Sequence, residues 1–425
     1  MKRRRIAARK GEKARGGTTP ARLVCGGVGP RRVPRWGRAL GVIAGLLPLA
    51  LAACGGAGAP SSRAPASSPA KPVWVVGSLD DLTGAGANGG EAQQKGLNFF
   101  VDQVNRSGGV AGHLLRVQYC DTQSTPTGGA TCARQLSTVN SHVVILAGAL
   151  PSTQGAIPQL SNVIGVSVLP VLFPKAGSSV FQVSALEKAV VAPMLSAVKS
   201  AHLQTIGVLY TADASGTSQL TAVQQGASAA GLKVVSRAMN PSASDVTTQL
   251  LQLKSDGAQV LFFASIGTAT LAALTSYHSL AMDLPVVLGA QAVTNSFLRA
   301  LPFPIPSRLY GISTLAAGSA GLTAAERSAW STFRARFKAY AHEPVDSEIS
   351  SAYYAGCVAA AALKGTGGGT AAEMTSYLTS NPITCLGAQM RFDIPGLNVV
   401  DQQPTSLAQA GPTVADGWGA VRTPL

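Results

Sequence analysis

The sequence predicts an α/β protein that is built from parallel sheets in two domains. Short apolar runs rich in β-branched residues alternate with amphipathic segments from residue 73 to about residue 290. This alternation is typical of parallel strands that are joined by helices packed on both faces of a sheet. About 350 residues follow position 71, which is too long for one hydrophobic core, so we expect two domains.

The first strand and helix have the clearest patterns. An apolar run over 73–79 predicts a buried strand, and apolar residues at positions 97, 100, 101 and 104 predict an amphipathic helix that Ser107-Gly108-Gly109 ends. The same reasoning predicts further strands over 115–119, 143–146, 166–169, 206–210, 260–263 and 286–288, and helices around 128–139, 153–162, 187–201, 217–230, 245–255 and 268–281.

Two more helices are expected near the C-terminus. Thr323 and Glu326 have the spacing of a capping box, and Trp330, Phe333 and Phe337 share one face of the helix that would follow. Residues 347–363 predict a second helix, rich in alanine. Few strands surround these helices, so we expect them to pack against an earlier sheet.

The positive charge of the chain is concentrated at its N-terminus. Residues 1–53 hold thirteen of the 34 lysines and arginines and one acidic residue, so the remainder has a net charge of only +3. Nucleic-acid binding, which the overall charge of +15 suggests, therefore loses its support. Basic residues ahead of a short apolar run are typical of a secretory signal, which we assign to 1–53.

A cysteine follows the apolar run. Leu51-Ala52-Ala53-Cys54 resembles the bacterial lipobox, which implies that Cys54 is acylated and anchors an extracytoplasmic protein to the bacterial cell membrane. A plain transmembrane anchor is the alternative, but the run has 15 residues, fewer than the ~20 that a spanning helix needs. Residues 54–71 are rich in Gly, Ala, Ser and Pro, which predicts a flexible tether.

Four cysteines remain after the leader. An even number outside the cytosol suggests disulfides, and of the three possible pairings we favour the two local ones, Cys120–Cys132 and Cys357–Cys385. A metal site is the alternative. No Cys-x-x-Cys occurs, and the histidines are scattered without ligand spacing, at positions 113, 142, 202, 278 and 342. We therefore expect neither a metal nor a cofactor.

Several motifs carry a resemblance to a known family. They are Leu82-Thr83-Gly84 after the first strand, the run from Gly96 to Gly112 with Asn105-Arg106-Ser107-Gly108-Gly109-Val110-Ala111-Gly112, the turn Cys120-Asp121-Thr122-Gln123-Ser124, and residues 148–154. Together they resemble the branched-chain amino acid (Leu/Ile/Val) receptor family of type I periplasmic binding proteins, which are the substrate-binding components of ABC transporters. The similarity extends from about residue 73 to about residue 391.

The resemblance implies an architecture and a function. The architecture is two doubly wound parallel-sheet lobes that three crossover strands join, and the function is capture of a small molecule between them for an ABC-type permease. Hinge closure around the ligand is the expected mechanism. The expected boundaries are 72–185 with 314–388 for lobe one and 186–313 with 389–425 for lobe two, with crossovers near 183–187, 311–315 and 387–392.

The family's binding residues transfer to this chain only in part. Ser152 matches the serine that binds the ligand's carboxylate, with Thr153 and Gln154 following it at the start of a helix; an N-cap role for Ser152 is compatible with this. Thr83 lies in the first motif. The remaining expected ligand residues are Phe173, Ser215 and Gln291.

Three of these positions depart from the family. Ser215 stands where the family has the tyrosine of an Asp-x-x-Tyr-Gly turn. Phe173 stands in the loop where the family has a threonine for the ligand's ammonium group, and Gln291 stands where it has a glutamate. A neutral amide cannot balance a desolvated ammonium, so we expect a less charged or more apolar ligand than an amino acid. Asp80 and Asp81 follow the first strand and could supply a carboxylate, or act in the turn.

An anchored hydrolase is the alternative from another class. No Gly-x-Ser-x-Gly occurs, because the stretch from Gly226 to Gly231 misses that spacing, and neither His-Glu-x-x-His nor a Walker loop is present. We therefore expect no enzyme activity. A lobe pair that senses a ligand or contacts a protein without transport is a third possibility, which the sequence does not distinguish from a transport receptor.

Overall fold

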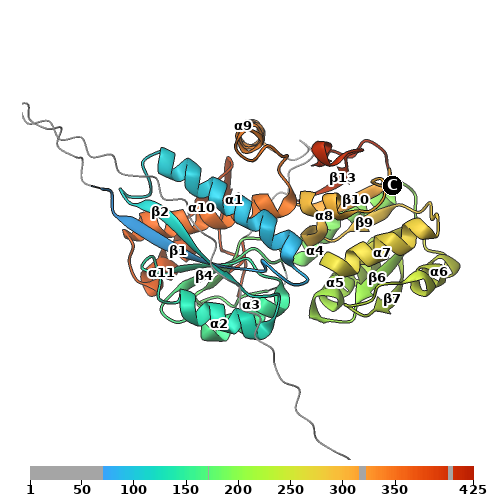
Figure 1. Ribbon diagram of the computed structural model, residues 1–425, viewed down its shortest axis with the longest axis horizontal. Coiled ribbons are helices and arrows are strands. Elements are labelled where there is room, and N and C mark those ends of the chain that lie inside the picture. Colours follow the sequence, from blue (N-terminus) through green and yellow to red (C-terminus); the bar gives the residue numbers. More distant parts are fainter. Residues whose placement is uncertain (1–69, 171, 315–321, 401–404) are drawn as a thin grey trace, which may run out of the picture. The chain divides into compact units, whose positions relative to one another are not determined.

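The computed structural model describes residues 70–170, 172–314, 322–400 and 405–425. They form two lobes, each built on a mostly parallel sheet that helices cover on both faces (Figure 1). The α/β class with two doubly wound lobes, as predicted, is confirmed. The expected signal peptide, Cys54 and most of the tether lie outside the described residues.

The first lobe contains a five-stranded sheet among the described residues, with the strand order β2-β1-β3-β4-β5. All of its neighbouring strands are parallel. β1 lies inside the sheet because it pairs with β2 over eight residues and with β3 over three. The strands are β1 (Val73–Asp80), β2 (Leu114–Asp121), β3 (Val143–Leu146), β4 (Ile164–Ser167) and β5 (Val180–Gln182).

Helices cover both faces of this sheet, and the alternation of side chains explains why. Val76 and Ile145 point into the core beneath α1 and α10, whereas Leu79 and Leu146 pack with α2 on the opposite face. The helices of this lobe are α1 (Ala87–Arg106), α2 (Pro126–Leu136), α3 (Leu150–Ala156), α10 (Ser347–Thr366) and α11 (Ala371–Ser380), with the short 3₁₀ helix η1 (Ile157–Gln159).

α1 and α10 approach each other closely at one glycine. A Cβ at Gly96 of α1 would collide with the backbone carbonyl of Ile349 in α10. Only glycine allows the two backbones to lie this near, so Gly96 sets the short distance between α1 and α10. This distance matters for the site, because the first turn of α10 faces the cavities described below.

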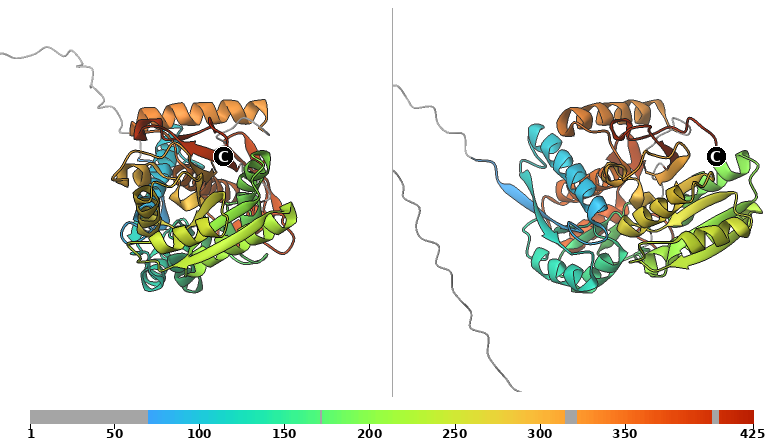
Figure 2. Two further views of the ribbon diagram at one scale, coloured as in Figure 1. Left: turned by 90° about the vertical axis from the view of Figure 1, so that its right-hand side faces the viewer. Right: turned by 45° about the vertical axis from the view of Figure 1, so that its right-hand side comes forward.

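α9 (Ala324–Ala341) lies at the top of both views in Figure 2. Its aromatic face packs on α1 and α10. Trp330, Phe333 and Phe337 are buried as predicted, and Phe333 contacts both Phe99 of α1 and Tyr353 of α10. The Thr323–Glu326 capping box that starts α9 is confirmed.

The second lobe contains a seven-stranded sheet among the described residues, in the order β14-β13-β10-β9-β8-β6-β7. β13 runs antiparallel to β10, and β14 antiparallel to β13; the other pairs are parallel. The strands are β6 (Thr205–Thr211), β7 (Lys233–Met239), β8 (Val260–Ala264), β9 (Val286–Leu288), β10 (Leu309–Ser313), β13 (Ser406–Ala410) and β14 (Trp418–Gly419).

Helices again pack on both faces of this sheet, α4 and α5 on one face and α6 and α7 on the other. Asp213 caps α5 by accepting from the Gly216 amide at 2.8 Å. The helices are α4 (Glu187–Ser200), α5 (Ala214–Ala230), α6 (Thr247–Ser255), α7 (Gly267–Ser279) and α8 (Asn295–Ala300), with the 3₁₀ helices η2 (Ala290–Ala292) and η3 (Val414–Asp416).

The third expected crossover is placed differently in the structure. Residues 388–390 form β12 (Ala388–Met390), which turns back on β11 (Ile383–Cys385) as a two-stranded hairpin. Leu386 and Gly387 both have positive φ, and this turn reverses the chain. The chain instead passes beside β5 at Val399, which bridges to Gln182, before it reaches β13.

Both expected disulfides are present. Cys120–Cys132 joins β2 to α2, and Cys357–Cys385 joins α10 to β11. Within the described ranges, no helix has the length and hydropathy to cross a bilayer.

Candidate functional site

Three adjoining cavities lie where the two lobes meet, in the part of the chain that the structure describes. Gln291 of η2 lines all three, so the cavities meet at this residue. Their volumes are about 20, 20 and 10 Å³. Each holds about one water molecule, and the side-chain amide of Gln291 has no hydrogen-bond partner within the described residues.

The first cavity is walled by α1 and the end of β1 from lobe one and by Ile266, Gly267 and Thr294 from lobe two. The second lies mainly in lobe two, against the starts of α4 and α5, and Pro170 of lobe one also lines it. The third lies between the start of α10 and the segment around Ala290. The polar residues that line the first cavity include Asp81, Asn88, Gln93 and Glu348. Those of the second include Glu187, Ser215, Gln219 and Ser265. Those of the third include Ser184, Thr314, Ser347 and Glu348.

Asp81 is enclosed at the floor of the first cavity. Its carboxylate accepts hydrogen bonds from the Ser152 hydroxyl at 2.8 Å, from the Ala149 amide at 3.0 Å and from the Thr122 hydroxyl. Glycines line it closely, since a Cβ at Gly86 or Gly148 would collide with the carboxylate. The donors of this pocket are thus already used by the protein's own carboxylate.

Glu348 lies in the first turn of α10 and faces both the first and the third cavity. Its Oε2 accepts from Gln93 Nε2 at 2.5 Å, and this is its one hydrogen bond within the described residues. Burial raises the pKa of Glu348 to about 8, and the nearby charge of Asp346 adds to this rise. Gln93 is 4% exposed, and its Oε1 has no partner.

Glu187 is the corresponding carboxylate of lobe two. It starts α4, lines the second cavity and accepts a hydrogen bond from the Ser218 hydroxyl at 2.8 Å. Burial raises its pKa to about 7. Two carboxylates from different lobes therefore line different cavities that meet at Gln291.

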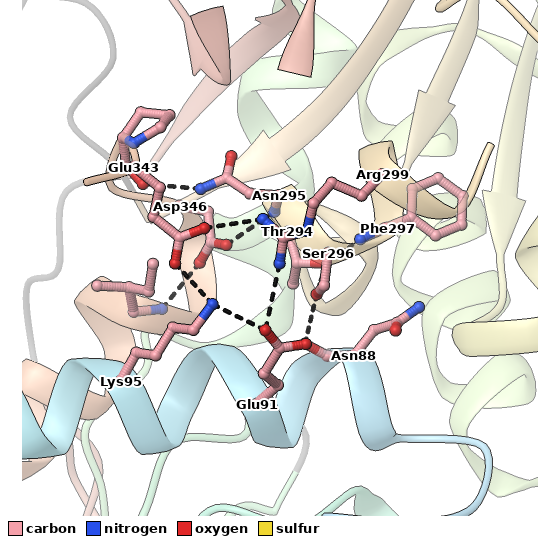
Figure 3. Close-up of polar contacts among 12 residues, drawn as sticks. Asn88, Glu91, Lys95, Thr294, Asn295, Ser296, Phe297, Arg299, Glu343 and Asp346 are labelled. Atoms are coloured by element: carbon pink, nitrogen blue, oxygen red, sulfur yellow. Dashed lines mark hydrogen bonds and ion pairs between the residues drawn. The ribbon is translucent and has the colours of Figure 1, made fainter. Parts of the chain in front are cut away.

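The start of α10 is bonded to lobe two. Asp346 accepts from the backbone amide of Ile349, which caps α10, and from the amide of Asn295 at 2.8 Å (Figure 3). Burial raises the pKa of Asp346 to about 7. The Ser296 hydroxyl also donates to the carbonyl of Asn88 in α1 at 2.9 Å, and the side-chain amide of Asn295 donates to the carbonyl of Pro344 at 2.7 Å, so several hydrogen bonds join the lobes directly.

Ion pairs cross the same boundary at the surface. Arg299 of α8 pairs with Glu91 of α1 at 3.2 Å and with Glu343, just before α10, at 2.8 Å. Lys95 of α1 pairs with the same two carboxylates, at 2.7 Å each (Figure 3). This four-residue cluster holds α1 and α8 together beside the first cavity.

The structure brings together only some of the expected site residues. Ser215 and Gln291 both line the second cavity. Ser152 and Thr153 are fully buried behind the first cavity, and Thr153 donates to the carbonyl of Gly148. Ser152 does have a carboxylate partner, but that partner is Asp81.

Three expected residues lie outside these cavities. Thr83 is exposed and donates to Asp121 at 2.7 Å, so it ties the turn after β1 to the end of β2. Gln154 is exposed on α3. Phe173 is 41% exposed and borders a separate groove of about 460 Å³ along α4 and α5.

The sequence reasoning missed Gln93, Glu187 and Glu348. Their signal was weak, because each stands in an otherwise ordinary helix where a polar residue usually faces solvent. A carboxylate in the alanine-rich stretch over 347–363 was the one available hint. Only the packing of that helix against α1 shows that Glu348 is buried.

No described residue that lines the three cavities is a lysine, arginine or histidine. Across the described ranges, no group of three or more His, Cys, Asp or Glu residues is arranged to hold a metal ion. The chemistry available in the cavities is therefore that of carboxylates, amides and hydroxyls.

Two parallel-sheet lobes that enclose polar cavities define a protein of the two-lobed solute-binding class. A family model described as periplasmic binding protein matches residues 74–409, and the chain belongs to this family. The family consists of binding proteins, so this chain is placed among binding proteins and not enzymes. The predicted resemblance to Leu/Ile/Val receptors is confirmed.

Individual relatives are distant. The Leu/Ile/Val-binding protein homolog 3 of Brucella melitensis is 23% identical over 233 residues, or 52% of this chain; the matched region spans 62% of that relative's length. The branched-chain amino acid transporter substrate binding protein LivJ of Streptococcus pneumoniae, solved with isoleucine, has a TM-score of 0.66 at 17% identity and covers 82% of this chain and 99% of its own.

Two further structures show how varied the ligands on this fold are. The fatty acid ABC transporter substrate-binding protein of Thermomonospora curvata has a TM-score of 0.65 at 17% identity, covering 82% of this chain and 90% of its own. A solute binding protein of Rhodopseudomonas palustris, solved with 3,4-dihydroxy benzoic acid, has a TM-score of 0.65 at 14% identity, and the match covers 81% of this chain and 94% of its own. At these identities the likeness establishes the fold alone.

Proposed function

We propose that this protein is an extracytoplasmic receptor that captures a small solute between its two lobes and delivers it to an ABC-type permease. The observation that carries the proposal is the set of three cavities around Gln291, with walls from both lobes. No catalytic arrangement is needed for this role; the site has to bind, close and release.

The volumes of the cavities require movement. A pocket for a small organic molecule usually encloses about 300 Å³ or more, whereas each cavity here encloses about 20 Å³ or less. A rotation of the Gln291 side chain would merge the cavities, and separation of the lobes would admit the solute. Ligand contacts with both lobes then favour the closed state by their difference in affinity for the two states.

Location and delivery belong to the same proposal. Two disulfides favour an oxidising compartment, and the lipobox-like Leu51-Ala52-Ala53-Cys54 favours a lipid anchor on Cys54. The three similar structures described above are solute-binding proteins of transporters, which favours a permease partner. The lobe boundaries near residues 185 and 313 belong to the same proposal, with the third crossing moved from residue 388 to the segment around Val399.

Ligand screening by calorimetry and thermal shift tests the binding role. Protein purified from cells that express the full chain is titrated with amines, amino acids, amides and carboxylates. A ligand at 100 times its dissociation constant should stabilise the fold by about 2.7 kcal/mol. Gln291→Leu, which fills the shared wall with an apolar side chain, should weaken binding about ten-fold or more, whereas Gln154→Ala on exposed α3 should leave it unchanged. A ligand whose affinity is the same in Gln291→Leu would contradict the site.

Metabolic labelling with a radioactive fatty acid tests the anchor. Wild-type protein should carry the label and sediment with membranes, and Cys54→Ala should do neither. An unlabelled wild-type protein refutes the lipid anchor but leaves the binding role standing.

A further inference from the structure

The place where the resemblance puts a ligand's carboxylate is filled by the protein itself. Asp81 takes the Ser152 hydroxyl, the Ala149 amide and the Thr122 hydroxyl, and it is 1% exposed. A carboxylate ligand that approached Ser152 would meet no free donor there and would face the charge of Asp81. Like charges this close repel strongly in a buried site.

The rest of the cavity surface has an excess of acceptors and two carboxyl groups that can become negatively charged when a cation binds. Glu348 and Glu187 each have a single hydrogen-bond donor within the described residues, Gln93 Nε2 and Ser218 Oγ. Gln93 Oε1 is buried and unpartnered beside the first cavity. A buried acceptor without a donor costs free energy, so these walls favour a ligand that brings N–H groups.

We propose that the cleft binds a small organic cation, an amine or a guanidine, that carries no carboxylate group. This inference rests on the proposed function and adds the substrate class to it. In the first cavity, the ligand's cationic N–H groups would donate to Glu348 and to Gln93 Oε1. An extended ligand with a second cationic group would also reach Glu187, on the side of lobe two.

This ligand class differs from the less charged or more apolar ligand expected from the sequence. That expectation rested on Phe173 and Gln291 standing where the family has a threonine and a glutamate. In the structure, two other carboxylates line the cavities that meet at Gln291. The negative charge lost at position 291 is therefore supplied from α10 and α4.

The carboxylates also predict how binding depends on pH. The groups that face Glu348 are Asp346 on its own helix, Asp81 across the first cavity and the neutral Gln93 on α1. Lys95, the nearby cation on α1, is paired with surface carboxylates. With a pKa of about 8, Glu348 is mostly protonated at pH 7 before a ligand binds.

Glu187 faces the Ser218 hydroxyl on α5 and lies beside Lys188 on its own helix. Its pKa of about 7 means that it is about half protonated at neutral pH. A bound cation favours the charged form of each carboxylate, so binding must release protons. The affinity for a cation should therefore rise as pH increases from 6 to 8, about ten-fold or more.

A matched set of three compounds tests the inference by calorimetry on the same full-chain protein. Isopentylamine is leucine without its carboxylate, isocaproate is leucine without its amino group, and leucine has both; agmatine adds a longer cation with two charged groups. Isopentylamine or agmatine should bind about ten-fold or more tightly than leucine and isocaproate. The heat in buffers of different ionisation enthalpy should show release of protons at pH 7.

Variants locate the interaction. Glu348→Gln keeps the shape of the side chain and should weaken amine binding about ten-fold or more, and Glu187→Gln should weaken agmatine more than isopentylamine. Asp283→Asn, which removes an exposed carboxylate, is the matched control and should change nothing. If a variant fails to fold, the pH dependence of the wild-type protein still tests the inference.

The outcomes are distinguishable. Tighter binding of leucine or isocaproate than of the amines, or amine affinity that falls with rising pH, overturns the inference and leaves the proposed function intact. If none of these compounds binds and the neutral amide isocaproamide does not bind either, the proposed function and the inference both fail.

Discussion

Replacing Asp81 with alanine is expected to reduce the free energy of unfolding by about 3–5 kcal/mol. The Ala149 amide and the Thr122 hydroxyl both lose their acceptor, while the Ser152 hydroxyl can still donate to the carbonyl of Ala149 at 2.9 Å. Each buried donor left unpaired costs about 1–3 kcal/mol, and a hydrogen bond to a charged group contributes about 1.5–3 kcal/mol. Two lost acceptors and a small cavity give the stated range.

Asp81→Asn should cost much less, about 1–2 kcal/mol. Its amide oxygen can still accept from the Ala149 amide, and the Thr122 and Ser152 hydroxyls can rotate to accept from the new NH₂ group. Comparing the two variants therefore separates the loss of hydrogen-bond partners from the loss of charge.

Urea unfolding, followed by circular dichroism and intrinsic fluorescence, measures both variants. Gln154→Ala, on the exposed side of α3, serves as the control and should change the free energy by less than about 0.5 kcal/mol. If Asp81→Ala costs under about 1 kcal/mol, or no more than Asp81→Asn, then Asp81 does not hold these donors and its assignment as the internal partner of Ser152 is wrong.

Three further predictions concern the rest of the fold. A double-mutant cycle of Arg299→Leu and Glu343→Gln should give a coupling of about 0.5 kcal/mol that weakens in high salt, since Arg299 is 40% exposed; a coupling independent of salt contradicts this. Burial raises the pKa of Asp80 to about 7. The folded state therefore keeps a proton that the unfolded state releases above pH 4, and stability should fall by up to about 4 kcal/mol as pH rises through 7. In Asp80→Asn this pH dependence of the free energy of unfolding should disappear, and an unchanged pH dependence refutes the prediction. Replacing Cys357 and Cys385 by serine opens a loop with a sequence separation of 28 and should cost about 3–4 kcal/mol in thermal or urea unfolding; a loss under about 1 kcal/mol contradicts that expectation.

The strands and helices that the sequence predicts correctly are those with a continuous or strictly periodic apolar pattern. β3 and β8 are buried along their whole length, so every residue contributes to the signal. β7 was missed because it is an edge strand whose residues are mostly half-exposed, and it includes the exposed Lys233 and the half-exposed Arg237. Its polar side chains hide the strand pattern.

The site was less accessible to sequence reasoning than the fold. Asp81 and Ser152 are 71 positions apart, and no local pattern indicates that their side chains meet. Glu187 and Glu348 stand in the first turns of helices, where acidic residues are common for electrostatic reasons alone. Their burial depends on how two lobes pack, which periodicity does not specify.

The position of β1 has a mechanical consequence. It is the first strand of the described fold, yet it lies inside the sheet, paired along eight residues on one side and three on the other. Tension applied at Val73 along the strand would load all of these hydrogen bonds together in shear, because ladder bonds run across the strand direction. Lobe one should therefore resist unfolding when the chain is pulled at its N-terminal end. In an optical trap, stretching the protein from residue 73 should require a high peak force before lobe one unfolds.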